Sequence, residues 1–256
     1  MTPAQILRLL LFVVLALPGV AGSDEPASLV ITYRARPENR VAFRTWLETK
    51  GAAQFAGWKK SGVFTEVQIF FGSLAATSTI DALVILDFAR YTDSARWKEV
   101  EREHPGGLSP EALKFAAAES SQFAEAISRG AGPGRDPAKA VYLVAFYEVP
   151  ADMPRYREYA RGYVEPQMRG WLEAGALSGF TMLANHAPLH HPWDALLVLE
   201  YSDLASLARR DEVKRAVRTR LAATDPNWAE WSKDKGGLRK ELSLFMADAI
   251  LLPATP

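Results

Sequence analysis

Short apolar runs alternate along this chain with amphipathic segments. Runs rich in β-branched and aromatic residues are typical of strands, and they occur at residues 29–33, 64–71, 82–88, 141–147, 177–184 and 195–201. Tyr156, Tyr159, Ala160 and Tyr163 fall at i, i+3, i+4 and i+7, which is the spacing of one helix face. Further helices are predicted over residues 92–103 and 204–221, and less apolar fourth strands over 119–127 and 241–250. The pattern therefore predicts a mixed α+β protein.

The same order of elements occurs twice, at an offset of 113 residues. Residues 81–102 and 194–215 are identical at nine of 22 positions, and the gapless alignment from Val30/Leu143 to Arg102/Arg215 has 15 identities in 73 pairs. Average composition would give about 4 identities. We therefore predict two tandem repeats, residues 28–129 and 140–253, which are joined by a flexible linker at 130–139.

Each predicted repeat has the β-α-β-β-α-β order of a ferredoxin-like unit, whose antiparallel sheet has helices on one face only. Its strands are apolar on both faces, so the open face must also be buried. The sequence resembles the dimeric α+β barrel superfamily, with the usual homodimer fused into one chain. The motifs Asp225-Pro226-Asn227-Trp228 and Ala249-Ile250-Leu251-Leu252-Pro253 resemble the C-terminal pattern of NIPSNAP-type members. This resemblance implies two tandem ferredoxin-like repeats whose sheets pack into an intrachain α+β barrel.

Successive side chains of a strand point to opposite faces of the sheet. In the predicted strands one set is uniformly apolar and is expected under the helices, whereas the mixed set is expected to face the barrel or its mouths. The mixed set supplies the candidate ligand-binding residues, which are Arg34, Glu66, Gln68, Asp87, Tyr147, Thr181, Asn185 and Glu200. Arg34 with Glu66 or Asp87 can form a ligand clamp, an acid–base pair or a structural ion pair. Because the alignment pairs Arg34 with Tyr147, we expect a single asymmetric site in one half.

Three of the four histidines, His186, His190 and His191, lie in one loop just before Asp194. Imidazoles and a carboxylate are ligands for zinc, copper or iron, and one imidazole can ligate haem. The spacing is not that of a helical HExxH site. Surface histidines without a ligand role are therefore the alternative interpretation. No dinucleotide loop, P-loop or G-x-S-x-G elbow is present in the sequence.

The N-terminus has the pattern of a secretory signal peptide over residues 1–22. Arg8 precedes the apolar run at residues 9–17, and Pro18 and small residues follow it. A retained membrane anchor is the alternative, although the run is shorter than the roughly 20 residues of a membrane span. The predicted location is periplasmic or secreted, with no membrane association after cleavage.

Composition removes several classes of function. The 30 Lys and Arg residues equal the 30 Asp and Glu residues, and no basic tract is present, which argues against nucleic acid as a partner. The chain has no cysteine, so disulfides, thiolate nucleophiles and Cys-ligated zinc are excluded.

The sequence therefore predicts an exported α+β barrel protein, a monomer or homodimer, that binds a small apolar or amphipathic molecule. The superfamily resemblance implies a possible cofactor-independent enzyme of the monooxygenase or isomerase kind. The first alternative is a haem- or metal-dependent enzyme that uses the His186, His190 and His191 loop. The second is a non-catalytic NIPSNAP-like interaction module.

Overall fold

A computed structural model describes residues 24–74, 80–186 and 192–253. The predicted signal segment at residues 1–22 lies outside them. The strands are β1 (Ala27–Ala35), β2 (Glu66–Gly72), β3 (Ala82–Phe88), β4 (Ala116–Ala131), β5 (Val141–Glu148), β6 (Leu177–Asn185), β7 (Ala195–Tyr201) and β8 (Lys240–Ala249). The helices are α1 (Arg40–Trp46), α2 (Ala52–Lys60), α3 (Ala95–Glu103), α4 (Met153–Tyr159), α5 (Glu165–Glu173), α6 (Leu204–Ala208), α7 (Arg210–Thr224) and α8 (Pro226–Asp234).

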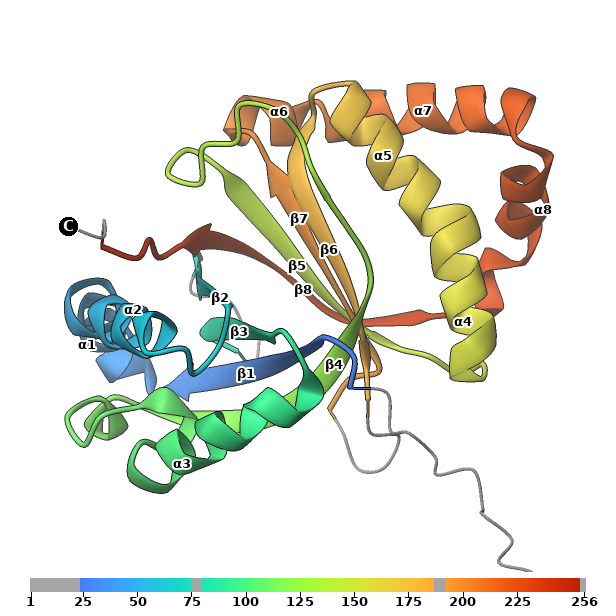
Figure 1. Ribbon diagram of the computed structural model, residues 1–256. Helices are drawn as coiled ribbons and strands as arrows, with labels where there is room; N and C mark the ends of the chain where they lie inside the picture. The colour runs from blue at the N-terminus through green and yellow to red at the C-terminus, as the bar shows by residue number, and fades with distance from the viewer. Residues whose placement is uncertain (1–23, 75–79, 187–191, 254–256) are drawn as a thin grey trace, which may run out of the picture.

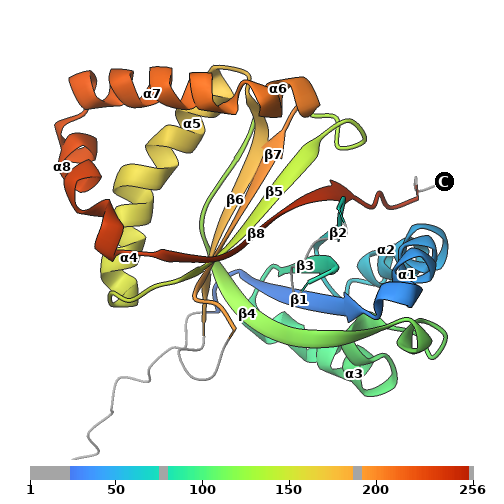
Figure 2. The ribbon, with the colours of Figure 1, turned by 180° about the vertical axis from the view of Figure 1, so that it is seen from behind.

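The strands form one closed antiparallel barrel in the order β1-β3-β2-β8-β5-β7-β6-β4. The long fourth strand of each half closes it: β4 pairs with β1 and with β6, and β8 pairs with β5 and with β2. In Figure 1 these two strands run between the lower and upper sheets, while α1–α3 cover one sheet and α4, α5 and α7 cover the other. Figure 2 shows the same two-layered arrangement from behind. The predicted α+β barrel is therefore confirmed.

The two halves share details beyond their element order. In each, the first long helix contains one π-helical turn, at Leu47–Gly51 between α1 and α2 and at Ala160–Val164 between α4 and α5. Gly62 and Gly175 follow α2 and α5 with φ of 75° and 67°, the left-handed conformation expected after a helix end. The helix starts differ: Asp152 caps α4 by accepting a 2.8 Å bond from the Arg155 amide, whereas Asn39 makes no cap bond at α1.

The core consists of three layers. Alternate strand residues such as Ile31, Val84, Phe180 and Leu197 pack under the helices of their own half. The opposite set, which includes Val30, Leu83, Val144 and Leu196, fills the middle of the barrel. Each sheet is therefore apolar on both faces, and the two halves bury each other's open face.

Candidate functional site

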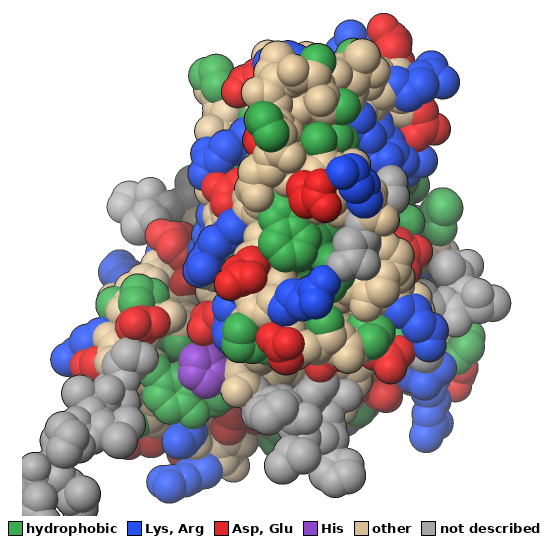
Figure 3. Space-filling model, turned by 90° about the vertical axis from the view of Figure 1, so that its right-hand side faces the viewer, with side chains coloured by type: hydrophobic (Ala, Val, Ile, Leu, Met, Phe, Trp, Pro, Cys, Tyr) green, Lys and Arg blue, Asp and Glu red, His purple; other side chains and the backbone are tan. Residues whose placement is uncertain are grey.

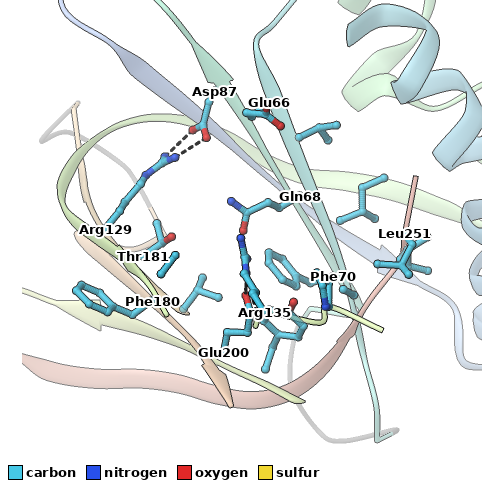
Figure 4. A pocket seen from close by; sticks show the side chains of 18 of the residues that line it. Glu66, Gln68, Phe70, Asp87, Arg129, Arg135, Phe180, Thr181, Glu200 and Leu251 are labelled. Atoms are coloured by element: carbon cyan, nitrogen blue, oxygen red, sulfur yellow. Dashed lines mark hydrogen bonds and ion pairs between the residues drawn. The ribbon is translucent and has the colours of Figure 1, made fainter. Parts of the chain in front are cut away.

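One end of the barrel is hollow. A cavity of about 530 Å³ lies there between the two sheets, beside the connection from β4 to β5. We call it the mouth cavity, and its lining residues are Glu66, Val67, Gln68, Ile69, Phe70, Asp87, Arg129, Gly130, Ala131, Arg135, Pro137, Tyr142, Phe180, Thr181, Val198, Glu200, Ala249, Ile250, Leu251 and Leu252. Figure 4 shows that labelled side chains from both halves converge on it.

Equivalent positions of the two halves face each other across the mouth cavity. Asp87 of β3 corresponds to Glu200 of β7, and Gln68 of β2 corresponds to Thr181 of β6, because Gln68 pairs with Ile85 and Thr181 with Val198 in matching registers. The cavity is therefore lined jointly by both halves, because the sheets approach each other through the faces that carry these residues. It differs in this from the single-half site that the sequence led us to expect.

The first ion pair joins β3 and β4, two strands of the first half that border the cavity. Arg129 of β4 donates two hydrogen bonds to Asp87, one from Nη1 to Oδ2 at 2.5 Å and one from Nη2 to Oδ1 at 2.6 Å. The Ser28 hydroxyl donates to the same carboxylate at 2.6 Å and accepts a bond from Arg129 at 2.9 Å. Donation of these hydrogen bonds to Asp87 raises the pKa of the Arg129 guanidinium. Both oxygens of Asp87 are thus occupied by donors.

The second ion pair involves the segment between β4 and β5. Arg135 donates from Nε to both oxygens of Glu200 at 2.7 Å and from Nη2 to Oε2, and the Ser178 hydroxyl donates to Oε1 at 2.8 Å. The side chain of Glu200 is 2% exposed and that of Arg135 is 41% exposed. Bonding to Glu200 raises the pKa of Arg135. A nearly fully buried carboxylate is therefore compensated by a cation that comes from the linker.

Tyr142 of β5 lies directly across the strand pair from Glu200. Burial, reinforced by the charge of Glu200, raises the pKa of the Tyr142 phenol well above its ordinary value. The phenol is therefore neutral at physiological pH. Its ring packs against Phe70 at a centroid distance of 4.9 Å and forms part of the apolar floor.

Besides the Tyr142 phenol, Gln68 and Thr181 supply uncharged polar side chains to the cavity. Gln68 is half-buried and Thr181 is 8% exposed. Within the part of the chain that the structure describes, no hydrogen bond engages the Gln68 amide or the Thr181 hydroxyl. In Figure 4 the Gln68 side chain extends into the cavity between the two arginines. These groups, rather than the carboxylates, are free to bind a ligand.

The structure brings together five of the eight candidate residues, because Glu66, Gln68, Asp87, Thr181 and Glu200 all line the mouth cavity. The other three lie elsewhere. Arg34 is exposed at the far end of β1. Asn185 is buried at the far end of β6, where its side-chain nitrogen donates to the Trp193 carbonyl at 2.9 Å. Tyr147 packs on the helix side of its sheet, beneath the Arg239 guanidinium at 4.4 Å from the ring centroid.

The prediction for Tyr147 is wrong because the repeat alignment slips by one residue in the first strand. Tyr33, not Arg34, is its structural equivalent: Tyr33 pairs with Ala82, and Tyr147 pairs with Ala195. The carbonyls of both tyrosines accept a 2.8 Å bond from the amides of Asp81 and Asp194. A shift of one position moves a side chain to the opposite face of the sheet.

The predicted metal loop is only partly described. His186 is exposed and stacks on Tyr91 at 5.8 Å, away from the mouth cavity, while His190 and His191 lie outside the described residues. The other described histidine, His104, packs against Trp58. No group of three His, Cys, Asp or Glu side chains suited to a metal occurs within residues 24–74, 80–186 and 192–253. The described cavity lining offers no imidazole for haem.

Arg129, Arg135 and Tyr142 are cavity residues that the sequence interpretation missed. Arg129 follows a bulge between Ala126 and Ser128 that shifts the alternation of β4. Arg135 lies in an irregular segment where no periodicity applies. Tyr142 precedes the aligned part of the repeat, although its alternation with Val144 and Phe146 places it inside the barrel.

A smaller cavity of about 190 Å³ lies at the opposite end of the barrel, lined by Thr32, Ile80, Glu119, Ser120, Phe146, Pro192, Trp193, Leu242 and Ser243. The outer surface carries mixed charge. On the face seen in Figure 3, acidic and basic side chains are interspersed. Among the described residues, no helix is long and apolar enough to span a membrane.

Comparison with solved structures supports the fold. By sequence, neither a family model nor a curated protein matches the chain. A structure described as a "putative monooxygenase" from Lactobacillus acidophilus NCFM is similar, with a TM-score of 0.52 and 10% identity over 88% of this chain and 94% of that one. A second structure with that description, from Fusobacterium nucleatum subsp. nucleatum, has a TM-score of 0.52 and 10% identity over 90% and 94%. An anthrone oxidase-like protein has a TM-score of 0.51 and 12% identity over 91% and 97%.

These similarities define the class of protein. The closed eight-stranded barrel, with helices packed outside each four-stranded half, is the dimeric α+β barrel fold. Here one polypeptide supplies both sheets. At this level of identity the similarity establishes the architecture, whereas function has to be argued from the cavity itself.

Proposed function

We propose that this chain binds a small amphipathic molecule in the mouth cavity. The observation that carries the proposal is a cavity of about 530 Å³ at the end of an otherwise packed barrel. Ligand sites typically measure ~300–1,000 Å³ and combine apolar walls with a few polar groups. Here Phe70, Phe180 and Val198 supply apolar surface, and Gln68 and Thr181 supply hydrogen-bonding groups.

The geometry favours binding over general base catalysis. A general base has to reach the proton that it removes and has to be free to accept it. Asp87 and Glu200 each accept hydrogen bonds from an arginine and a serine. Glu66 is bonded to Lys59 at 2.6 Å and is largely exposed. All three carboxylates are therefore already engaged by cationic donors.

Turnover of the bound molecule without a dedicated cofactor is the second candidate function. The fold similarity to two structures named as monooxygenases and to an anthrone oxidase-like protein favours it. Such a reaction would use the same mouth cavity, so the binding experiment below applies to both candidates. The haem alternative has less support, since the described lining contains no histidine, and an interaction module would not require a cavity of this size.

The binding experiment compares two threonines on the inside of the barrel. The protein is purified without detergent, and bound small molecules are identified by native and denaturing mass spectrometry. Thr181→Phe places a bulky ring in the mouth cavity, whereas Thr32→Phe fills the smaller cavity at the other end. We expect Thr181→Phe to lose the co-purified molecule and Thr32→Phe to retain it. Loss in Thr32→Phe alone would refute the mouth cavity as the site.

We also propose that the chain acts in the periplasm or outside the cell. The N-terminal pattern of Arg8, the apolar run and the small residues up to Gly22 supports export. N-terminal sequencing of the protein from each cell fraction tests this. Cleavage near residue 22 in the exported fraction is the expected result, and an uncleaved chain in the cytoplasmic fraction would contradict it.

A further inference from the structure

The mouth cavity contains charged groups but no unpaired charge among its described residues. Three carboxylates, from Glu66, Asp87 and Glu200, are each bonded to one cation, namely Lys59, Arg129 and Arg135. Of these cations, Arg129 and Arg135 line the cavity, and Lys59 lies outside the lining and neutralises Glu66 from there. A charged ligand that enters this space has to give up its hydration and finds no free counter-charge in return, which is costly.

Two polar groups remain without partners in the described part of the cavity, and they lie at equivalent positions of the two sheets. The Gln68 amide carries two N–H donors and one carbonyl acceptor, and the Thr181 hydroxyl both donates and accepts. Thr181 as a whole residue is 8% exposed, and its hydroxyl has no side-chain hydrogen bond among the described residues. Because the residue lines the cavity, this hydroxyl is available to water or to a ligand.

The lining next to these two groups is apolar. Phe70 lies two residues after Gln68 on the same face of β2, Val198 pairs with Thr181, and Phe180 also lines the cavity. A molecule that fills the cavity therefore meets apolar side chains beside the Gln68 amide and the Thr181 hydroxyl.

From these observations we infer that the mouth cavity selects an uncharged ligand, an aromatic or alicyclic ketone or alcohol, whose oxygen is bound by Gln68 and Thr181. The inference rests on the proposed binding function and specifies its ligand class. Gln68 is the specificity-determining residue: its amide donates to a ligand carbonyl, and Thr181 accepts from a ligand hydroxyl or donates to a carbonyl. The two ion pairs keep the arginines from attracting an anion.

Three naphthalene dyes of similar size test the inference by fluorescence titration. They are the neutral ketone propionyl-dimethylaminonaphthalene, its ketone-free parent dimethylaminonaphthalene, and the anion anilinonaphthalene sulfonate. We expect the ketone to bind about 3- to 10-fold more tightly than its parent, the value of one net hydrogen bond. The sulfonate should bind more weakly than both neutral dyes.

Variants assign the selectivity to residues. Gln68→Met keeps the side-chain length and should remove the advantage of the ketone while leaving the parent dye within about twofold, since only the hydrogen bond is lost. The matched control is Gln122→Met, which changes a half-buried glutamine of β4 that is not among the described lining residues. Glu200→Gln and Asp87→Asn each free one arginine and should increase sulfonate affinity; the two variants provide independent tests if one fails to fold.

The outcomes separate the inference from the proposed function. If Thr181→Phe leaves the binding of all three dyes unchanged, the mouth cavity is not the site and the proposed function fails. If Thr181→Phe abolishes binding but wild-type protein prefers the sulfonate, or Gln68→Met retains the ketone preference, the inference is overturned while the proposed function stands. Absence of saturable binding of the ketone to wild-type protein overturns the inference as well.

Discussion

The Arg135–Glu200 pair allows a quantitative test of how the mouth cavity is built. Glu200 has a side-chain exposure of 2% and Arg135 of 41%, so the two partners respond differently to truncation. In Arg135→Met the carboxylate stays buried and retains the neutral Ser178 and Tyr142 hydroxyls as donors, but no cation among its described partners. Breaking a buried pair in this way typically costs ~3–5 kcal/mol. Because solvent already reaches Arg135, we expect a smaller loss of about 2 kcal/mol.

Truncation of the other partner should be less harmful. In Glu200→Gln the amide oxygen can still accept from Ser178, and the partly exposed guanidinium can turn to water, so we expect a loss of about 1 kcal/mol. The double variant Arg135→Met/Glu200→Gln contains no buried charge at this position. It should therefore be more stable than Arg135→Met alone by about 1 kcal/mol, which is a coupling between neighbouring sites.

Equilibrium urea unfolding followed by tryptophan fluorescence measures these differences, and a loss of about 2 kcal/mol corresponds to a fall in Tm of roughly 4–8 °C for a chain of this size. Arg129→Met is the matched control, because its partner Asp87 is more exposed, at 13%, and should suffer less. The reasoning is refuted if Glu200→Gln is as destabilising as Arg135→Met, or if the two losses add in the double variant.

Three further predictions concern the fold. Burial raises the pKa values of Tyr33, Tyr142, Tyr156 and Tyr201. At neutral pH the folded and unfolded chains both keep these protons, so the shifts do not affect stability there. Above about pH 10 only the unfolded chain releases the protons, and the free energy of unfolding should therefore fall as pH rises. Tyrosinate absorbance should therefore appear together with unfolding, and a gradual titration of the folded protein would contradict this. Gly106→Ala should lower the free energy of unfolding in urea by at least about 2 kcal/mol, because φ is +59° and the new Cβ would lie 2.5 Å from Ala118 Cβ. Gly175→Ala has a similar φ of +67° but open space around the new Cβ, so it should lower that free energy by only about 1 kcal/mol. The isolated first half should aggregate or dimerise in light scattering, because Val30, Phe70, Leu83 and Ile85 would be exposed; a stable monomer would refute mutual shielding of the sheets.

The strands with apolar runs could be predicted from sequence because burial on both faces leaves a clear local signal. Residues 82–88 and 195–201 coincide with β3 and β7. The fourth strands were predicted too short: β4 extends over Ala116–Ala131, well beyond 119–127. Its polar residues give a weak signal, and its stability comes from pairing with β1 and β6, which is not a local property.

The candidate cavity residues that lie on regular strands could be predicted, because successive side chains of a strand alternate between the two faces of the sheet. Glu66, Gln68 and Asp87 follow from the parity of β2 and β3, and Thr181 and Glu200 from that of β6 and β7. The two arginines do not follow from parity, because one lies beyond a bulge and the other in the linker. The carboxylates were therefore found without the cations that neutralise them, and a clamp between Arg34 and Asp87 was considered in place of the actual Asp87–Arg129 pair.

The slip between Arg34 and Tyr147 shows why sequence identity alone cannot assign a sheet face. The offset of 113 is correct for β3 and β7, yet β1 and β5 correspond at an offset of 114, as the pairing of Tyr33 with Ala82 and of Tyr147 with Ala195 requires. The gapless alignment places this strand one residue out of register, because Pro37 and Pro150, which follow the strands, are identical at an offset of 113. A single residue of error does not change the predicted element, but it exchanges the two faces of the strand. Hydrophobicity could not reveal the error, because both faces of the strand are buried. The asymmetry inferred from Arg34 and Tyr147 was therefore a product of the alignment. The halves actually differ at Ser28, which pairs with Asp87, and at the equivalent Tyr142, which pairs with Glu200.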